Sequence, residues 1–116
     1  MNNILLGAFG EQSASRYLRA EGYKIVAANY KTYVGELDIV AEKDNIFCVV
    51  EVKTRQKSTM LPPSEAVDYR KQENIKGSAA AFLNRYNVKK EVRYDIIEVI
   101  VDGREVISIN HIKNAF

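Results

Sequence analysis

The stretch GELDIVAEKDNIFCVVEVK, residues 35–53, predicts a β-hairpin. Its two halves, residues 35–42 and 46–53, have the length of strands and are rich in β-branched and aromatic side chains. The polar residues between the halves are typical of a turn. A two-residue loop at Asp44 and Asn45 fits, because Asp and Asn tolerate a positive φ better than most residues. We therefore expect this hairpin to form the centre of the fold.

The two-residue loop determines which side chains face one another across the hairpin. In that register Asp38 lies opposite Glu51, and Glu36 lies opposite Lys53. All four side chains project from one face, because residues two apart in a strand share a face. Directly opposed carboxylates repel each other, so we expect a cation or a proton to relieve the Asp38–Glu51 pair. A three-residue loop would instead place Asp38 opposite Val50 and send it to the other face.

Length and composition indicate one globular domain spanning residues 1–116. The apolar content of 47% and charged content of 28% are ordinary, and a net charge of +2 only weakly favours a polyanionic partner. No apolar run approaches the roughly 18 residues of a membrane span, and no signal-peptide pattern opens the chain. Cys48 is the only cysteine, which excludes an internal disulfide and fits a reducing compartment. These features predict a cytoplasmic protein that does not enter a membrane.

The segments flanking the hairpin predict a helix and a strand before it and a loop after it. The helix covers residues 7–21, carries Glu11 on its inward stripe and ends at Gly22. The strand covers residues 23–30. Residues 54–63 are polar, end in two prolines and are typical of a mobile loop.

The rest of the chain predicts a second helix and a second hairpin. The helix covers residues 64–86, with Ser64 as its N-cap. The hairpin pairs residues 94–101 with residues 105–109, and residues 111–116 predict one last helical turn. The fold class is therefore α/β: a mixed sheet flanked by helices, in the order α-β-β-β-α-β-β.

The strand over residues 46–53 is predicted to be covered on both faces. Cys48, Val50 and Val52 face one way, whereas Phe47 and Val49 face the other. A strand that is apolar on both faces is typical of the centre of a sheet packed between helices. The charged residues that follow Val49 on its face therefore lie at one end, where we expect the sheet to open to solvent.

Two carboxylates and a lysine in this pattern favour metal-assisted chemistry on a phosphate. Mg²⁺ prefers oxygen ligands and is often held by one or two carboxylates plus substrate phosphate. Asp38 and Glu51 supply the carboxylates, with the Val52 carbonyl as a third ligand, and Lys53 could orient a water or stabilise the transition state. The implied reaction is hydrolysis of a phosphodiester. The alternative is a solvated strand face with a Glu36–Lys53 ion pair, which would contribute little.

Residues on the two helices extend the candidate site. Glu11 points along the inward stripe of its helix and could complete the metal site, or it could be an acid favoured by the helix N-terminus. Lys71 lies on the inward extension of the second helix and could contact the scissile phosphate or hold Glu51. The alternative for Lys71 is an ordinary solvated lysine.

For five charged residues the sequence allows either a structural or a functional role. Arg55, Lys57, Arg70 and Lys71 flank the predicted loop and could form a rim that contacts phosphates, or an ordinary charged surface. Asp95, near the start of a predicted strand, is either a buried polar organiser or a turn residue.

The motif formed by residues 35–38 and 49–55 resembles the signature of the PD-(D/E)xK nuclease superfamily. More closely, the chain resembles the small bacterial YraN-like family, which is similar to archaeal Holliday-junction resolvases. The resemblance covers essentially the whole chain, and Leu37 stands where the superfamily name has proline. The further matching positions are Gly10, Glu11, Ala14, Tyr17, Leu18, Gly22, Tyr23, Asn29, Tyr30, Ala66, Lys71, Arg93, Tyr94, Asp95 and residues 111–116.

The resemblance implies a restriction-endonuclease-like fold. It also implies that Glu11, Asp38, Glu51 and Lys53 occupy active-site positions. The leading hypothesis is an endonuclease that depends on Mg²⁺ or Mn²⁺ and cleaves DNA, with branched DNA such as a Holliday junction as one candidate substrate. A resolvase would be expected to form a homodimer, because a four-way junction presents two equivalent scissile strands. The alternatives are a non-catalytic nucleic-acid-binding or repair-accessory module and a protein-interaction domain.

Overall fold

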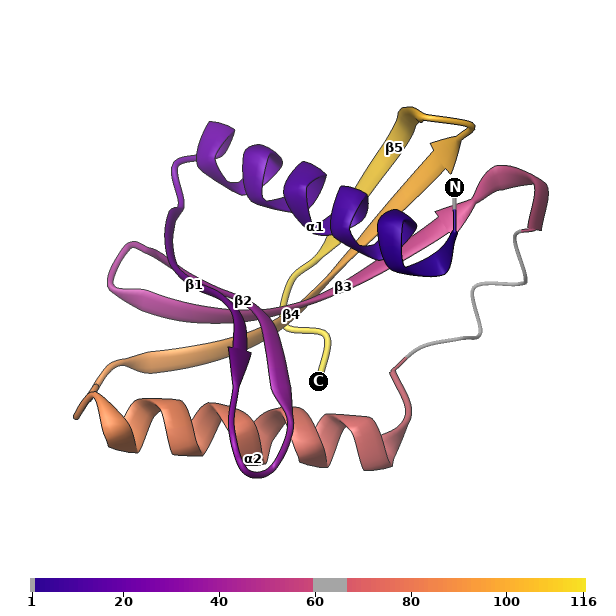
Figure 1. Ribbon diagram of the computed structural model, residues 1–116. Helices are drawn as coiled ribbons and strands as arrows, with labels where there is room; N and C mark the ends of the chain where they lie inside the picture. The colour runs from indigo at the N-terminus through magenta and orange to yellow at the C-terminus, as the bar shows by residue number, and fades with distance from the viewer. Residues whose placement is uncertain (1, 60–66) are drawn as a thin grey trace.

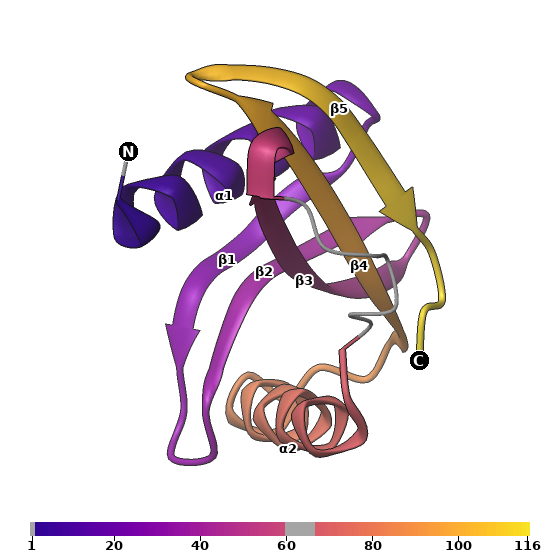
Figure 2. The same cartoon turned by 90° about the vertical axis from the view of Figure 1, so that its right-hand side faces the viewer.

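A computed structural model describes residues 2–59 and 67–116. Two long helices and five strands are arranged as a sheet with a helix on each side (Figures 1 and 2). In chain order the elements are α1 (Asn3–Ala20), β1 (Lys24–Lys31), β2 (Glu36–Lys43), β3 (Ile46–Gln56), the short 3₁₀ helix η1 (Lys57–Thr59), α2 (Tyr69–Arg85), β4 (Glu91–Asp102) and β5 (Glu105–Ile112). The predicted order α-β-β-β-α-β-β is confirmed.

The five strands follow one another across the sheet in the order of the chain, β1-β2-β3-β4-β5. Neighbouring strands are antiparallel, except that β3 and β4 are parallel. Parallel neighbours need a long crossover, and α2 lies within that connection. The sheet is therefore mixed, as the sequence predicts. Within residues 2–59 and 67–116, no helix has the length and apolar character that crossing a membrane requires.

Each face of the sheet carries its own apolar core. On the α1 side, Cys48 and Val50 of β3 pack with Leu18 of α1. On the α2 side, Phe47 and Val49 pack with residues of α2 and with the end of the chain. This division confirms that β3 is apolar on both faces and covered on both. The α2-side core contains Leu37, Val40, Phe47, Val49, Val67, Ile75, Ala79, Phe82 and Ile96.

The turn between β2 and β3 is the predicted two-residue loop. Asp44 and Asn45 both have left-handed backbone angles, with φ of 53° and 64°, which matches the twist of the flanking strands. The predicted register is also confirmed as far as the pair Ile39 and Val50. The ladder ends there, so the predicted pairing of the residues before Ile39 with those after Val50 does not continue.

Several predicted boundaries were wrong. Residues 54–59, predicted as part of a loop, form the end of β3 and η1, and β4 begins at Glu91 instead of residue 94. Residues 60–63 of that predicted loop lie outside the described residues. Helix α1 begins at Asn3, because the side chain of Asn2 caps it by accepting a hydrogen bond from the Leu5 N–H. Ser64, the predicted N-cap of the second helix, lies outside the described residues, and α2 begins at Tyr69 with Asp68 as its N-cap. The tail makes no final helical turn; instead β5 continues along β4 to Ile112.

Candidate functional site

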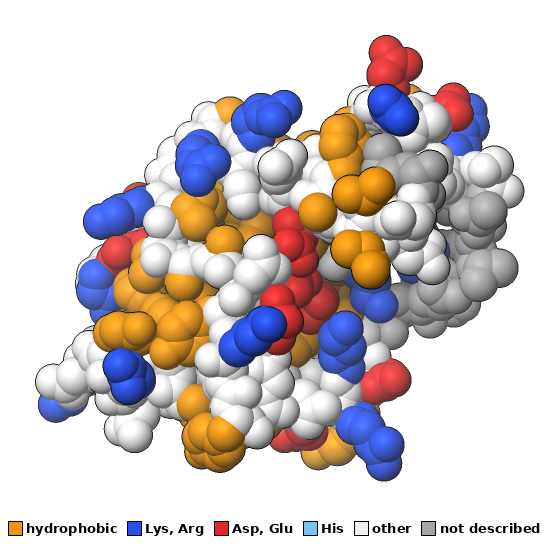
Figure 3. All heavy atoms as spheres, in the orientation of Figure 1, with side chains coloured by type: hydrophobic (Ala, Val, Ile, Leu, Met, Phe, Trp, Pro, Cys, Tyr) orange, Lys and Arg blue, Asp and Glu red, His pale blue; other side chains and the backbone are white. Residues whose placement is uncertain are grey.

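A cavity of about 530 Å³ lies where α1, β2, β3 and α2 approach one another. It is more polar than the cores, and acidic side chains form a band near the middle of this face of the molecule, with lysine and arginine side chains beside it (Figure 3). We call it the acidic cavity. It is lined by Glu11, Gly35, Glu36, Asp38, Glu51, Asp68, Arg70, Lys71, Asn74, Ile75 and Ser78.

Asp38 stands where the β2–β3 ladder ends. Counting from the turn, pairing of β2 with β3 stops at Ile39. The next residue, Asp38, accepts a hydrogen bond of 2.9 Å from the Val52 N–H with its carboxylate. The side chain thus replaces a backbone partner and is held against β3. Because the strands part at this point, Asp38 also borders a second cavity on the α1 side of the sheet.

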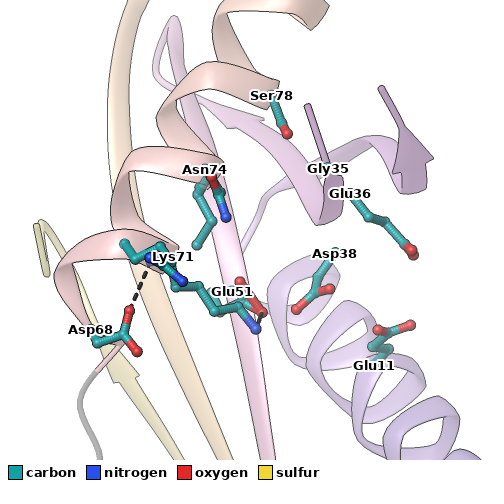
Figure 4. A pocket seen from close by; sticks show the side chains of 11 residues that line it. Glu11, Gly35, Glu36, Asp38, Glu51, Asp68, Lys71, Asn74 and Ser78 are labelled. Carbon is teal, nitrogen blue, oxygen red and sulfur yellow. Dashed lines mark hydrogen bonds and ion pairs between the residues drawn. The ribbon is translucent and has the colours of Figure 1, made fainter. Parts of the chain in front are cut away.

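Glu51 is a buried acid on the central strand, with only 7% of its surface exposed. Burial, together with a hydrogen bond to Asp38 and the charge of that residue, raises the pKa of Glu51 to about 8. Lys71 lowers the pKa, since its Nζ lies 3.6 Å from Glu51 Oε1. Figure 4 shows Lys71 reaching from α2 to Glu51 while Asp38 and Glu51 approach each other. The two carboxylates are therefore close together, although Asp38 and Glu51 are not paired in the β2–β3 ladder as predicted, and Lys71 provides the nearby positive charge.

Glu11 reaches the same cavity from α1. The helix can approach β3 because residue 10 is glycine: a Cβ on Gly10 would lie 1.8 Å from Thr54 Oγ1. Burial and the negative charge of Asp38 raise the pKa of Glu11, whereas a hydrogen bond with Asn29 lowers it. Asp38 of β2 thus raises the pKa values of two acids from two other elements, Glu11 of α1 and Glu51 of β3.

Asn29 is a contributor that sequence reasoning did not assign to the site. It lies in β1 with a φ of 51°, between two residues that pair with Ile39 and Leu37 of β2. A left-handed residue inside a strand is uncommon outside Asn, Asp and Gly. The signals in the sequence are an asparagine near the end of a predicted strand and its place among the positions that match the family pattern. The residues Asp68, Asn74 and Ser78 also line the acidic cavity without having been predicted.

Of the other predicted site residues, some reach the acidic cavity and some do not. Arg70 lines the acidic cavity. Lys53 is half-buried in β3 beside Glu98 of β4 and does not line the cavity. Arg55 forms an ion pair with Glu98, 3.6 Å from Nε to Oε2, and the exposed Lys57 lies in η1. The structure therefore brings Arg70 and Lys71 to the acids and leaves the other cations along β3 and η1.

Basic residues also flank Asp38 on its other side. The second cavity that Asp38 borders has a volume of about 450 Å³ and shares Glu11 and Asp38 with the acidic cavity. Arg16 and Arg19 of α1 line it. We call it the α1-side cavity. The acids accordingly lie between two sets of cations, with Arg70 and Lys71 on α2 on one side and Arg16 and Arg19 on the other.

The oxygen atoms at the acidic cavity suit a hard cation that takes few of its ligands from side chains. Among the described residues, no group of three or more His, Cys, Asp or Glu side chains is gathered closely enough to hold a metal ion by itself. Asp38 and Glu51 are close enough to share a hydrogen bond, and their repulsion is what a cation would relieve. Two carboxylates, a backbone carbonyl such as that of Val52, and waters match the coordination that Mg²⁺ accepts.

Asp95 belongs to a separate, buried network, which resolves its two predicted alternatives in favour of a polar organiser. It is fully buried, and it accepts hydrogen bonds from Arg93 Nε at 2.9 Å and from the Asn114 N–H at 3.0 Å. His111 Nε2 lies 2.8 Å from its other oxygen. Burial alone would raise the pKa of Asp95, but the bonds from His111, Arg93 and Asn114 together hold it down at about 2.

Comparison with known proteins gives a family but no activity. A model of the family described as "Uncharacterised protein family UPF0102" matches residues 10–99. A UPF0102 protein of Syntrophomonas wolfei is 44% identical over 98% of this chain and 99% of its own length. A UPF0102 protein of Caldanaerobacter subterraneus is 40% identical over 100% of this chain and 98% of its own length. One of Clostridioides difficile is 38% identical over the full length of both chains. The names of these relatives state no substrate or reaction.

Proposed function

The chain belongs to the uncharacterised protein family UPF0102, and because that name assigns no activity, we propose a function from the site itself: metal-dependent hydrolysis of phosphodiester bonds in DNA. The observation that carries the proposal is the buried Glu51 beside Asp38, bordered by Lys71 and reached by Glu11. A purely structural pair of acids would be unfavourable at the core of a sheet. Perturbed acids in a cavity are typical of functional sites.

Mg²⁺ or Mn²⁺ would be held by the carboxylates of Asp38 and Glu51, with the Val52 carbonyl as a third ligand. When bound, such an ion lowers the pKa of a coordinated water and neutralises charge that develops on the phosphate. The hydrogen bond from the Val52 N–H to Asp38 orients that carboxylate, as outer-shell contacts commonly do for metal ligands. Asp38 lies near enough to raise the pKa of Glu11, and Glu11 could accept a proton from water.

Cations close to the acids support phosphate binding. Lys71 contacts Glu51 while its side chain is 52% exposed, so the ammonium group is accessible to a phosphate. The sequence-based hypothesis gives Lys71 a contact with the scissile phosphate and gives Lys53 the task of orienting a water or stabilising the transition state. In the folded protein Lys71 lines the cavity and Lys53 does not. Arg70 on the same side, with Arg16 and Arg19 on the other, could hold phosphates on either side of the scissile bond.

Cleavage assays with matched variants test this proposal. Purified protein would be incubated with labelled duplex, flap, single-stranded and four-way-junction DNA, with Mg²⁺, Mn²⁺ or chelator. We expect metal-dependent cleavage that Asp38→Asn or Glu51→Gln abolishes. The control is Asp44→Asn, which removes an exposed acid in a turn whose positive φ suits asparagine. Cleavage that persists in both site variants, or in chelator, would contradict the proposal.

A non-catalytic nucleic-acid-binding module is the second candidate. The observation in its favour is that the described residues offer only two closely placed carboxylates instead of three metal-binding side chains. DNA binding without cleavage under any metal would favour it. The predicted homodimer remains a prediction, which light scattering with and without a four-way junction tests directly.

A further inference from the structure

A third cavity lies beside the tip of the β1–β2 hairpin, at the C-terminal end of α2, and its lining differs from that of the acidic cavity. Its volume is about 670 Å³, within the range of small-molecule and nucleobase pockets. Three tyrosines and two cations line it, and none of the described lining residues is acidic. We call it the tyrosine cavity. It is lined by Ala28, Asn29, Tyr30, Lys31, Thr32, Tyr33, Ala81, Asn84, Arg85 and Tyr86.

The tyrosines expose aromatic surface to solvent. Tyr33 is 93% exposed and Tyr86 is 53% exposed. Isolated exposed apolar residues are ordinary, but a gathering of rings in one hollow indicates a binding surface. Figure 3 shows hydrophobic side chains gathered on the left of the face, beside the acidic band.

The floor of the tyrosine cavity is a packed aromatic cluster. Tyr30 meets Phe82 edge-on with ring centroids 5.0 Å apart, and Phe82 lies 5.0 Å from the ring of Tyr86. Tyr30 and Tyr86 are 6.1 Å apart, and the guanidinium of Arg85 lies 5.9 Å from the Tyr86 ring. These contacts restrict the rings before any ligand arrives, which lowers the entropic cost of binding.

One hairpin tip separates the tyrosine cavity from the acidic cavity. Thr32 and Tyr33 line the first, whereas Gly35 lines the second. Thr32 Oγ1 donates to Gly35 O at 2.9 Å and lies 3.1 Å from Ser78 Oγ of α2, so the tip is fastened to the helix. Gly77 permits this contact, because a Cβ there would lie 3.0 Å from Val34. The two cavities therefore lie on opposite sides of a fixed wall.

We propose that the tyrosine cavity binds an unpaired nucleobase of the strand whose phosphodiester lies at the acidic cavity. This inference rests on the proposed function. Every base has a face that can stack on tyrosine, and Lys31 and Arg85 offer positive charge to the neighbouring phosphates. The amide of Asn84 can both donate to and accept from a base edge. DNA containing an unpaired nucleotide is therefore the preferred substrate class, and uniform duplex is not.

Stacking can be measured without cleavage. The probe is a short duplex with one bulged 2-aminopurine, whose fluorescence falls on stacking, titrated with protein in chelator so that no bond is cut. We expect quenching and preferential binding of the bulged probe over the fully paired duplex. Tyr33→Ala and Tyr86→Ala should each reduce affinity for the bulged probe about tenfold and reduce the quenching, with affinity for paired duplex nearly unchanged.

Three further variants separate the contribution of the rings from that of charge. Tyr69→Ala is the matched control, because Tyr69 is a 75% exposed tyrosine of α2 that does not line the tyrosine cavity. Tyr33→Phe keeps the ring and should bind like the unmodified protein. Arg85→Ala should weaken binding of bulged and paired DNA alike, since it acts through phosphate.

The outcomes separate this inference from the proposed function. Equal affinity for both probes, no quenching, or equal loss in Tyr69→Ala would overturn the inference, whatever the cleavage assay gives. Quenching that needs the tyrosines, in a protein that never cleaves, would support the inference and remove only the nuclease proposal. Association of the protein with itself through these rings, seen as a concentration-dependent change in mass lost in Tyr86→Ala, would also overturn the inference.

Discussion

Lys71 Nζ lies 3.6 Å from Glu51 Oε1, which joins the first turns of α2 to the buried acid of the central strand. Among the described residues this contact is the ion pair that Glu51 makes. It lowers the pKa of Glu51, whereas burial raises it. The strength of the contact is limited, because half of the lysine side chain is exposed to water.

Replacing Lys71 with methionine should raise the pKa of Glu51 further and weaken DNA binding. Without metal, we expect the free energy of unfolding near pH 8 to fall by less than about 1 kcal/mol, given the exposure of the lysine. Chemical denaturation in chelator measures the change, and filter binding measures the affinity. Lys89→Met, which removes an exposed lysine after α2, should change neither. Equal effects in both variants would show that Lys71 has no special role.

The pKa of Glu51 makes metal-free stability depend on pH. Its ordinary pKa is 4.5, and its folded value is about 8, so between these values the folded protein holds a proton that the unfolded chain releases. The free energy of unfolding should therefore fall as pH rises from about 5 to 8, by at most about 1.4 kcal/mol for each pH unit. Glu51→Gln should raise the melting temperature at pH 8.5 and change it little at pH 4.5. A difference that is the same at both pH values would argue against a buried carboxyl that stays protonated near neutral pH.

The Gly10–Thr54 contact predicts that α1 tolerates no added methyl group at position 10. Alanine favours helix by about 1 kcal/mol over glycine, but its Cβ would lie 1.8 Å from Thr54 Oγ1, so the clash dominates. We expect Gly10→Ala to lower stability by about 1–3 kcal/mol and to lower cleavage by displacing Glu11. Gly7→Ala is the control, because a Cβ there has nothing within 4 Å; it should stabilise the protein. Adding Thr54→Ala should recover part of the loss in the Gly10 variant.

The Asp95 network predicts a stability contribution that is lost in acid. Its pKa of about 2 is below the ordinary 3.8, so its contribution is present above pH 4 and should disappear as pH falls towards 2. Asp95→Asn should cost several kcal/mol, roughly 3–5, because it leaves the partly exposed Arg93 and the buried side chain of His111 with less compensation. Thermal unfolding of both proteins at pH 7 and pH 3 measures this. A variant as stable as the unmodified protein at pH 7 would rule out an organising role.

Local chemistry made much of the fold predictable. Asp44 and Asn45 specified the turn, and the turn specified the register as far as Ile39 and Val50. The alternation of Phe47 and Cys48 correctly assigned the two faces of β3 to two cores. These features depend on neighbours in sequence or on period-two patterning, which a single sequence displays directly.

The parts of the site that depend on contacts between distant elements were harder to predict. No local sequence pattern indicates that the β2–β3 ladder ends before Asp38 is reached. The expected pairing of Glu36 with Lys53 was therefore wrong. The contact of Lys71 with Glu51 was predicted only as one of several alternatives for Lys71, because the choice among them depends on how α2 docks against the sheet; the ion pair confirms it. The role of Asn29 depends on a left-handed φ that propensity alone does not reveal.

The β2–β3 hairpin also bears on the order in which the site comes into being during synthesis. Both of its acids are made before any residue of α2, and an isolated hairpin can form in about 1–10 μs, far faster than translation adds residues. The nascent chain therefore holds Asp38 and Glu51 before Lys71 exists. Docking of α2 brings in the cation that contacts Glu51, so this acid acquires its ion-pair partner only after the hairpin that carries it can form.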